Sequence, residues 1–318
     1  MIEVSQLSKR FGAVTAVDGL SFAVRPGHVT GFLGPNGAGK TTTMRLILGL
    51  DVPTSGTALV GGRRYRQIVR PLREVGALLD ATAVHAGRTA RDHLLSLARS
   101  NGIGPRRVTE MLRLTGLDAV AGKRAGGFSL GMKQRLGIAA ALLGDPPVLM
   151  FDEPVNGLDP EGVHWIRDLF KALAAEGRTV FVSSHLMSEM ALTADRLVII
   201  GRGRLIADTT VARLTEAGGD VLVRSPQAAG LRGLLTGRGA TVMEVPNDGG
   251  LSVRGMDAPG IGELAARHGI ALHELTPRRS SLEEAYLNIT GDSVQYRAEP
   301  AGTGARRDSS AKAGEGAR

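Results

Sequence analysis

The chain of 318 residues has no cysteine and few aromatic side chains. The absence of cysteine excludes disulfide bonds and cysteine-bound metals, and is compatible with a reducing compartment. Aromatic residues make up 3% of the chain, which leaves little surface for stacking nucleobases. The net charge of +8 is carried mainly by arginine, in a sequence also rich in alanine and glycine. We therefore attribute the charge to composition bias and expect no nucleic acid partner.

Long apolar runs are also missing. No stretch approaches the roughly 18 consecutive apolar residues that a membrane span needs. The first residues, "MIEVSQLSKRF", alternate polar and apolar side chains and do not form the apolar run of a signal peptide. We therefore expect a soluble chain, in which 42% hydrophobic residues supply a core for about two domains.

The first two thirds of the sequence mix strand and helix patterns. "IEVSQL", "VTAVDGLSFAV" and "HVTGFL" predict strands, and residues 88–144 are helical in character. "PPVLMF" and "TVFVSS" are short apolar runs typical of strands buried in a parallel sheet, with a crossover helix between them. The pattern predicts an α/β domain over residues 1–208, with a helical subdomain at about 80–145.

The pattern changes from residue 209 onward. Strand and helix signals follow in the order β-α-β-β-α-β, the last strand being "IALHEL" at 270–275, before a short helix "SSLEEAYLNI". We predict a ferredoxin-like α+β domain over residues 209–296. Residues 297–318 are rich in Gly, Ala, Ser and Arg without periodicity, which predicts a disordered tail.

The strongest motif is "GFLGPNGAGKTT", which fits G-x-x-x-x-G-K-[ST] directly after a predicted strand and before a helix. Such a loop turns its backbone N–H groups toward phosphates, and the following helix adds partial positive charge. Lys40 would reach the β- and γ-phosphates, and the Thr41 hydroxyl would bind Mg²⁺. The expected nucleotide contacts are Gly34, Pro35, Asn36, Gly37, Ala38, Gly39, Lys40, Thr41 and Thr42.

Two further strand ends carry reactive side chains. "VLMFDEP" presents Asp152 and Glu153 where α/β sheets place their ligands. Asp152 would hold Mg²⁺ and Glu153 would polarise the attacking water. His185 follows "TVFVSS" at the end of the next strand, and we predict a catalytic role for it as well.

With these motifs in order, the chain resembles the ATP-binding subunit of an ABC transporter over about residues 1–208. "FSLGMKQR" matches the family signature, "NGLDP" the D-loop and "SSH" the switch histidine. The resemblance implies a P-loop ATPase fold: a mostly parallel sheet core, an antiparallel β subdomain and a helical insertion. It also implies that Phe11 in "KRFG" stacks on adenine.

The same resemblance implies a dimer. The signature stretch has no acid, base or nucleophile arranged for chemistry. This is expected if the stretch forms one half of a binding site whose other half lies in a second subunit. Ser129, the Gly131 backbone and the following helix start would contact the phosphate of the opposing subunit. Asp159 would belong to the loop that passes signals between the two sites.

The sequence departs from the family pattern in several places. Asp80 stands where the family has a glutamine that contacts Mg²⁺, so its role at the metal is open. Phe128, Leu130 and Met132 replace typical Leu, Gly and Gln in the signature. Five arginines between residues 63 and 73 favour a solvated surface, with contact to anionic lipid as the alternative.

The C-terminal "ELTPRRSSLEEAYLNITG" makes the whole chain similar to the daunorubicin-resistance branch of drug and antibiotic exporters. That resemblance implies an ATPase at the cytoplasmic face of the membrane that drives separate permease subunits, with an amphiphilic compound as cargo. The alternative is a non-transport ABC ATPase acting on nucleic acid or the ribosome. A P-loop kinase would leave the signature and His185 unexplained.

Overall fold

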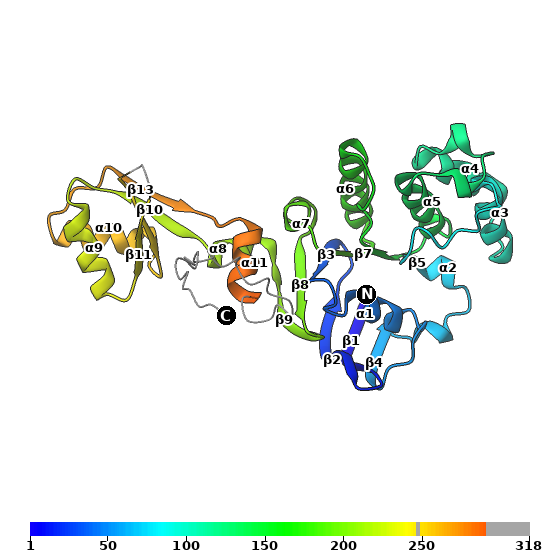
Figure 1. Cartoon of the computed structure of the whole chain (residues 1–318), viewed down its shortest axis with the longest axis horizontal. Coiled ribbons are helices and arrows are strands. Elements are labelled where there is room, and N and C mark those ends of the chain that lie inside the picture. Colours follow the sequence, from blue (N-terminus) through cyan, green and yellow to red (C-terminus); the bar gives the residue numbers. More distant parts are fainter. Residues whose placement is uncertain (246–248, 291–318) are drawn as a thin grey trace, which may run out of the picture.

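The computed structural model describes residues 1–245 and 249–290, so the tail predicted at 297–318 lies outside the described residues. Three sheets organise the described part. Figure 1 shows two of them in one half of an elongated molecule, and the third at its far end. Helices α8 (Val211–Ala217) and α11 (Leu282–Thr290) lie between the two halves.

The central sheet has six strands in the order β5-β6-β7-β3-β8-β9. All neighbouring strands are parallel except the pair β8 and β9, which form an antiparallel hairpin. The six strands are β3 (His28–Leu33), β5 (Val75–Leu78), β6 (Val148–Asp152), β7 (Thr179–Ser184), β8 (Arg196–Gly201) and β9 (Arg204–Thr210). Strands β6 and β7 are buried throughout, as their unbroken apolar runs predict.

Both faces of this sheet are covered. One face packs against an antiparallel sheet, β2-β1-β4, and helix α1 (Lys40–Ile47). The strands of that sheet are β1 (Ile2–Phe11), β2 (Val14–Val24) and β4 (Ser55–Val60). The helices on the opposite face form the larger core cluster. This arrangement is the predicted α/β domain with an antiparallel β subdomain, which we call the cassette.

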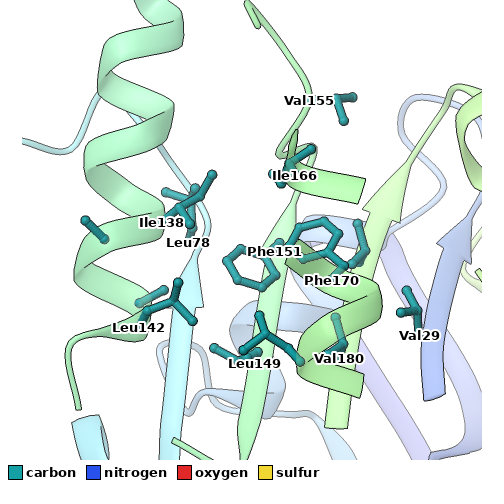
Figure 2. Packing of buried hydrophobic residues seen from close by; sticks show 14 of the residues in the cluster. Val29, Leu78, Ile138, Leu142, Leu149, Phe151, Val155, Ile166, Phe170 and Val180 are labelled. Atoms are coloured by element: carbon teal, nitrogen blue, oxygen red, sulfur yellow. The ribbon is translucent and has the colours of Figure 1, made fainter. Parts of the chain in front are cut away.

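The larger cluster includes the helical insertion and two helices that follow it along the chain. These helices are α3 (Ala90–Ser100), α4 (Pro105–Leu114), α5 (Leu130–Leu142), α6 (Pro160–Ala175) and α7 (Met187–Thr193). A short helix, α2 (Pro71–Glu74), precedes β5. Figure 2 shows the aromatic rings of Phe151 on β6 and Phe170 on α6 packed together, with centroids 4.7 Å apart. Over residues 1–245 and 249–290, no helix is long and apolar enough to cross a membrane.

Helix α5 sits directly on β5, at the edge of the sheet. Ile138 of α5 lies beside Leu78 of β5 in Figure 2. Gly76 on β5 makes this close approach possible, since a Cβ atom there would lie 2.0 Å from the carbonyl oxygen of Ala141. The position of α5 therefore depends on the absence of a side chain at residue 76.

The third sheet is antiparallel, in the order β11-β12-β10-β13, and two helices cover one of its faces. Its elements are β10 (Asp220–Arg224), α9 (Ala228–Gly237), β11 (Thr241–Glu244), β12 (Leu251–Arg254), α10 (Ala258–Arg267) and β13 (Glu274–Arg278). Their order is the predicted β-α-β-β-α-β. The last strand lies later than the predicted 270–275, and its Pro277 is tolerated because β13 is an edge strand.

Helices α8 and α11 pack against each other and contact the cassette. Leu214 of α8 and Leu282 and Tyr286 of α11 belong to the same buried cluster as the cassette helices, and α11 contacts α7. The segment after residue 209 is thus tied back to the cassette by its final described helix. The predicted division at residue 209 stays a prediction.

We expect Gly76→Ala to lower the free energy of unfolding by about 1–3 kcal/mol, because the added methyl group forces α5 away from β5. Urea unfolding followed by circular dichroism measures this change. Gly122→Ala is the matched control, since no atom lies within 4 Å of a Cβ built there. The control should change stability by less than about 0.5 kcal/mol. Equal stability of the two variants would contradict the packing argument.

Candidate functional site

The predicted motifs meet because three neighbouring parallel strands end at the same edge of the sheet. Strand β7 lies between β3 and β6, and Asp152 on β6 is in register with Ser183 on β7. Leu33 on β3 is in register with Ser184. The loops that begin after these strands therefore start side by side, as ligand sites of α/β sheets do.

The phosphate loop connects β3 to α1. Gly39 precedes the helix with a φ of 101°, in the left-handed region that glycine adopts without strain. The Lys40 side chain is 7% exposed, and its ammonium group donates a hydrogen bond of 2.7 Å to the Gly34 carbonyl oxygen. An open cavity of about 570 Å³ lies over the loop. It is lined by Ala16, Pro35, Asn36, Gly37, Ala38, Gly39, Lys40, Thr41, Thr42 and Glu153.

Asp152 joins the phosphate loop to the strand ends. Its buried carboxylate accepts a hydrogen bond of 2.6 Å from the Thr41 hydroxyl and a second one from the Ser183 hydroxyl. Thr41 and Asp152 thus place a hydroxyl and a carboxylate oxygen next to each other. Oxygen atoms of this kind are what Mg²⁺ binds beside nucleotide phosphates, so the donor set fits that ion.

Glu153 contributes a carboxylate to the lining of the cavity. One of its oxygens, Oε1, lies 3.6 Å from the Lys40 ammonium nitrogen. The other, Oε2, lies 2.8 Å from Nδ1 of His185. The structure thus brings together three residues predicted from separate motifs. A carboxylate between an ammonium group and an imidazole can accept a proton from a water molecule at the cavity edge.

Sequence reasoning missed three residues at this site. The Ser183 hydroxyl accepts from the Glu153 backbone N–H at 3.0 Å while it donates to Asp152. Gln134 of α5 donates from Nε2 to the Glu153 carbonyl oxygen at 2.9 Å. Ala16 lines the cavity. Ser183 stands two residues before His185 at a strand end and Gln134 lies within the signature stretch "FSLGMKQR", so both had an available signal, whereas Ala16 has none.

The predicted signature residues lie at helix starts. The Ser129 hydroxyl caps α5 and accepts from the Met132 backbone N–H at 3.2 Å. Asp159 caps α6 in the same way, from the Gly162 N–H at 2.9 Å. Gly131 packs on the Gly157 carbonyl group. None of Ser129, Gly131 and Asp159 is among the described residues that line the phosphate-loop cavity of their own chain.

Phe11 and Asp80 also lie outside the residues that line the cavity. Phe11 ends β1 with half of its surface exposed, and the Lys9 ammonium group lies 4.8 Å from its ring centroid. The exposed Asp80 carboxylate accepts hydrogen bonds from the Thr82 hydroxyl at 2.6 Å and the Thr82 backbone N–H at 2.7 Å. These bonds lower the pKa of Asp80, the side-chain bond most strongly. Asp80 thus organises its own loop as a carboxylate.

Comparison with known proteins gives three family matches, one of them a model described as AAA domain, putative AbiEii toxin, Type IV TA system, over residues 123–191. The family described as ABC transporter matches residues 17–156, which include the phosphate loop, the signature helix and Glu153. A domain of unknown function matches residues 219–283, the four-stranded sheet with its two helices.

Whole-length relatives are more informative. An uncharacterized ABC transporter ATP-binding protein, YhcH of Bacillus subtilis (strain 168), is 35% identical over 93% of this chain and 97% of its own. The bacitracin transport ATP-binding protein BcrA of Bacillus licheniformis is 36% identical, covering 92% and 97%. The Nod factor export ATP-binding protein I of Paraburkholderia xenovorans (strain LB400) is also 36% identical, covering 92% and 98%.

Solved structures match the cassette. An ATP-binding subunit of an ABC transporter has a TM-score of 0.62 at 29% identity, covering 67% of this chain and 91% of its own. A dimeric post-hydrolysis state of the ATP-binding cassette MJ0796 has a TM-score of 0.61 and shares the fold at 22% identity, covering 66% and 99%. With whole-length relatives above 30% identity and the motifs assembled on one sheet edge, the chain belongs to the ATP-binding proteins of ABC transporters and is an ATPase.

Proposed function

We propose that this chain is the motor subunit of a membrane exporter, working as a homodimer that closes around two Mg-ATP molecules. The proposal rests on the contacts of Glu153, whose carboxylate lies between Lys40 of the phosphate loop and His185. Two whole-length relatives are named for bacitracin transport and Nod factor export. Those names favour export over the alternative, an ABC ATPase acting on nucleic acid or the ribosome.

ATP would bind along the start of α1. The backbone N–H groups of residues 36–42 and the Lys40 ammonium group would supply positive charge to the phosphates. Thr41 and Asp152 would hold Mg²⁺, which neutralises phosphate charge when bound. Phe11, exposed at the end of β1, would stack on the adenine ring.

Hydrolysis requires a group that orients water and accepts its proton. Glu153 lines the cavity, which supports this role for it. His185 at 2.8 Å holds one carboxylate oxygen and keeps the other directed toward Lys40. The Glu153 carboxylate is the general base of the proposal, and His185 positions it.

The second ATP-binding half would come from a second copy of the chain. Ser129, Gly131 and Asp159 do not line the cavity of their own subunit, although Ser129 and Gly131 stand at a helix start suited to phosphate. Two copies facing each other would place these residues over the opposing γ-phosphate. Closure that requires ATP supplies the differential binding energy that a transporter uses.

The rest of the transporter would be separate permease subunits, with this chain bound at the cytoplasmic face of the membrane. We propose a drug, antibiotic or other amphiphilic compound as cargo, chosen by the permease. The segment 209–296 would be an accessory domain that stabilises the dimer or regulates it. Its attachment through α8 and α11 to the cassette core supports such a coupling.

We expect Lys40→Ala to weaken ATP binding at least about tenfold, since a hydrogen bond to a charged group contributes roughly 1.5–3 kcal/mol. Isothermal titration calorimetry with Mg-ATP measures the affinity. Lys171→Ala, which removes an exposed lysine of α6, is the charge-matched control and should bind as the unmodified chain does. Unchanged affinity in Lys40→Ala would contradict the proposal that this loop binds the phosphates of ATP.

We expect Glu153→Gln to bind ATP, turn over at least about 100-fold more slowly, and accumulate as an ATP-bound dimer, because the amide cannot accept the proton of water. Size-exclusion chromatography with light scattering in saturating Mg-ATP detects the dimer. A monomer under those conditions would contradict the proposed closure. Normal turnover would show that another group is the base.

We expect Asp80→Gln to retain ATPase activity within about threefold. The Asp80 carboxylate is engaged with Thr82 in its own loop, and glutamine supplies an acceptor oxygen on a longer side chain. Steady-state ATPase rates at several Mg²⁺ concentrations test this. If turnover collapses, the carboxylate of Asp80 has been recruited to the metal site.

A further inference from the structure

The backbone of Glu153 adopts an unusual conformation. Its φ is +48°, in the left-handed region, where a non-glycine residue needs support from its surroundings. Two side chains bind the backbone of Glu153, one at its N–H group and the other at its carbonyl oxygen. Ser183 on β7 accepts from the Glu153 N–H, and Gln134 on α5 donates to the Glu153 carbonyl oxygen. A third bond comes from the Asn156 N–H to the same carbonyl oxygen.

The Gln134 side chain is only 4% exposed, and the orientation of its amide follows from its partner. The Glu153 carbonyl oxygen can only accept, so the amide must direct its Nε2 group toward it. The other end, Oε1, has no hydrogen-bond partner among the described residues. A buried acceptor without a partner destabilises the fold. The residue is therefore poorly explained by stability alone, since a leucine of similar size would leave no unpaired oxygen.

Helix α5 contacts the Glu153 loop at two points. Gln134 holds the first residue of the loop, and the helix start at Leu130 and Gly131 packs on Gly157, four residues later. Ser129, the cap of the same helix, is one of the residues proposed to contact the opposing phosphate. About one and a half helical turns separate Ser129 from Gln134, so the helix connects the two as a rigid element.

We propose that Gln134 is a positioning residue for hydrolysis: it fixes the backbone of Glu153 to the helix whose start would contact the ATP of the other subunit. The inference rests on the proposed role of Glu153 as the base. When the start of α5 engages a phosphate, the Gln134 bond holds the Glu153 carboxylate in line with its own cavity. The bond therefore makes the rate of hydrolysis depend on the position of the signature helix.

The first test is Gln134→Leu, which keeps the size of the side chain and removes both polar atoms. We expect kcat for ATP to fall about tenfold, while KM and the calorimetric affinity for Mg-ATP stay within twofold. The melting temperature should be unchanged or higher, because the unpaired Oε1 is gone. An unchanged kcat would overturn the proposal.

The second test is Gln134→Glu, for which the pH dependence of kcat distinguishes a lost hydrogen bond from a packing defect. At neutral pH the new carboxylate cannot donate to the Glu153 carbonyl oxygen, whereas its protonated form can. We expect the ratio of its kcat to that of the unmodified chain to rise as the pH is lowered from 8 to 6. A ratio that stays flat with pH would overturn the proposal, even if Gln134→Leu does not fold.

Two controls distinguish a loss of packing in α5 from an error in the proposed role of Glu153. Ile138→Val removes a buried methyl group from the same helix without touching Glu153, and should lower the melting temperature but leave kcat unchanged. If it lowers kcat as much as Gln134→Leu does, loss of packing explains both. Glu153→Gln is measured in parallel. Retained turnover in Glu153→Gln would refute the role of Glu153 as the base. If Glu153→Gln loses turnover while Gln134→Leu keeps it, only the proposed role of Gln134 is refuted.

Discussion

The buried carboxylate of Asp152 is the interaction on which the arrangement of the site depends. A charged group removed from water must be hydrogen-bonded, and here both of its oxygens accept from hydroxyl groups, Thr41 at the start of α1 and Ser183 at the end of β7. The three segments come from distant parts of the sequence. Because Asp152 fixes them together, the next residue, Glu153, must leave the strand beside the phosphate loop, where Lys40 and His185 contact it.

Helix α5 connects this site to the helical insertion. Its C-terminal end rests on β5 across Gly76, its fifth residue donates to the Glu153 carbonyl oxygen, and its start packs on Gly157. A change in the position of α5 therefore acts on the catalytic loop at two points. Because α5 packs along β5, it joins the helical insertion to the sheet that carries the site.

The sequence predicted the parts of the site that are local and chemically distinctive. The phosphate loop, Asp152, Glu153 and His185 each follow a strand of recognisable pattern, and parallel strands bring such positions to one edge. Ser183 and Gln134 were not predicted because their roles are contacts across 30 and 19 residues. Their positions, near His185 and within the signature stretch, mark them as close to the site, but no sequence pattern identifies the atoms that they bind. The last strand of the small sheet was placed too early, since an apolar run such as "IALHEL" marks burial and does not fix where pairing begins.

This arrangement helps to explain one of the residues at which the signature departs from the family pattern. Leu130 stands where the family typically has glycine, and its side chain packs against Gly157 while 47% of it stays exposed. In a closed dimer that exposed apolar surface would be covered, and burying it contributes about 25 cal/mol for each Å² removed from water. The same side chain limits how closely α5 can approach the Glu153 loop. In the proposed mechanism, closure and the position of Glu153 would be linked through Leu130 at the helix start, because Gln134, one turn further on, donates to the Glu153 carbonyl oxygen.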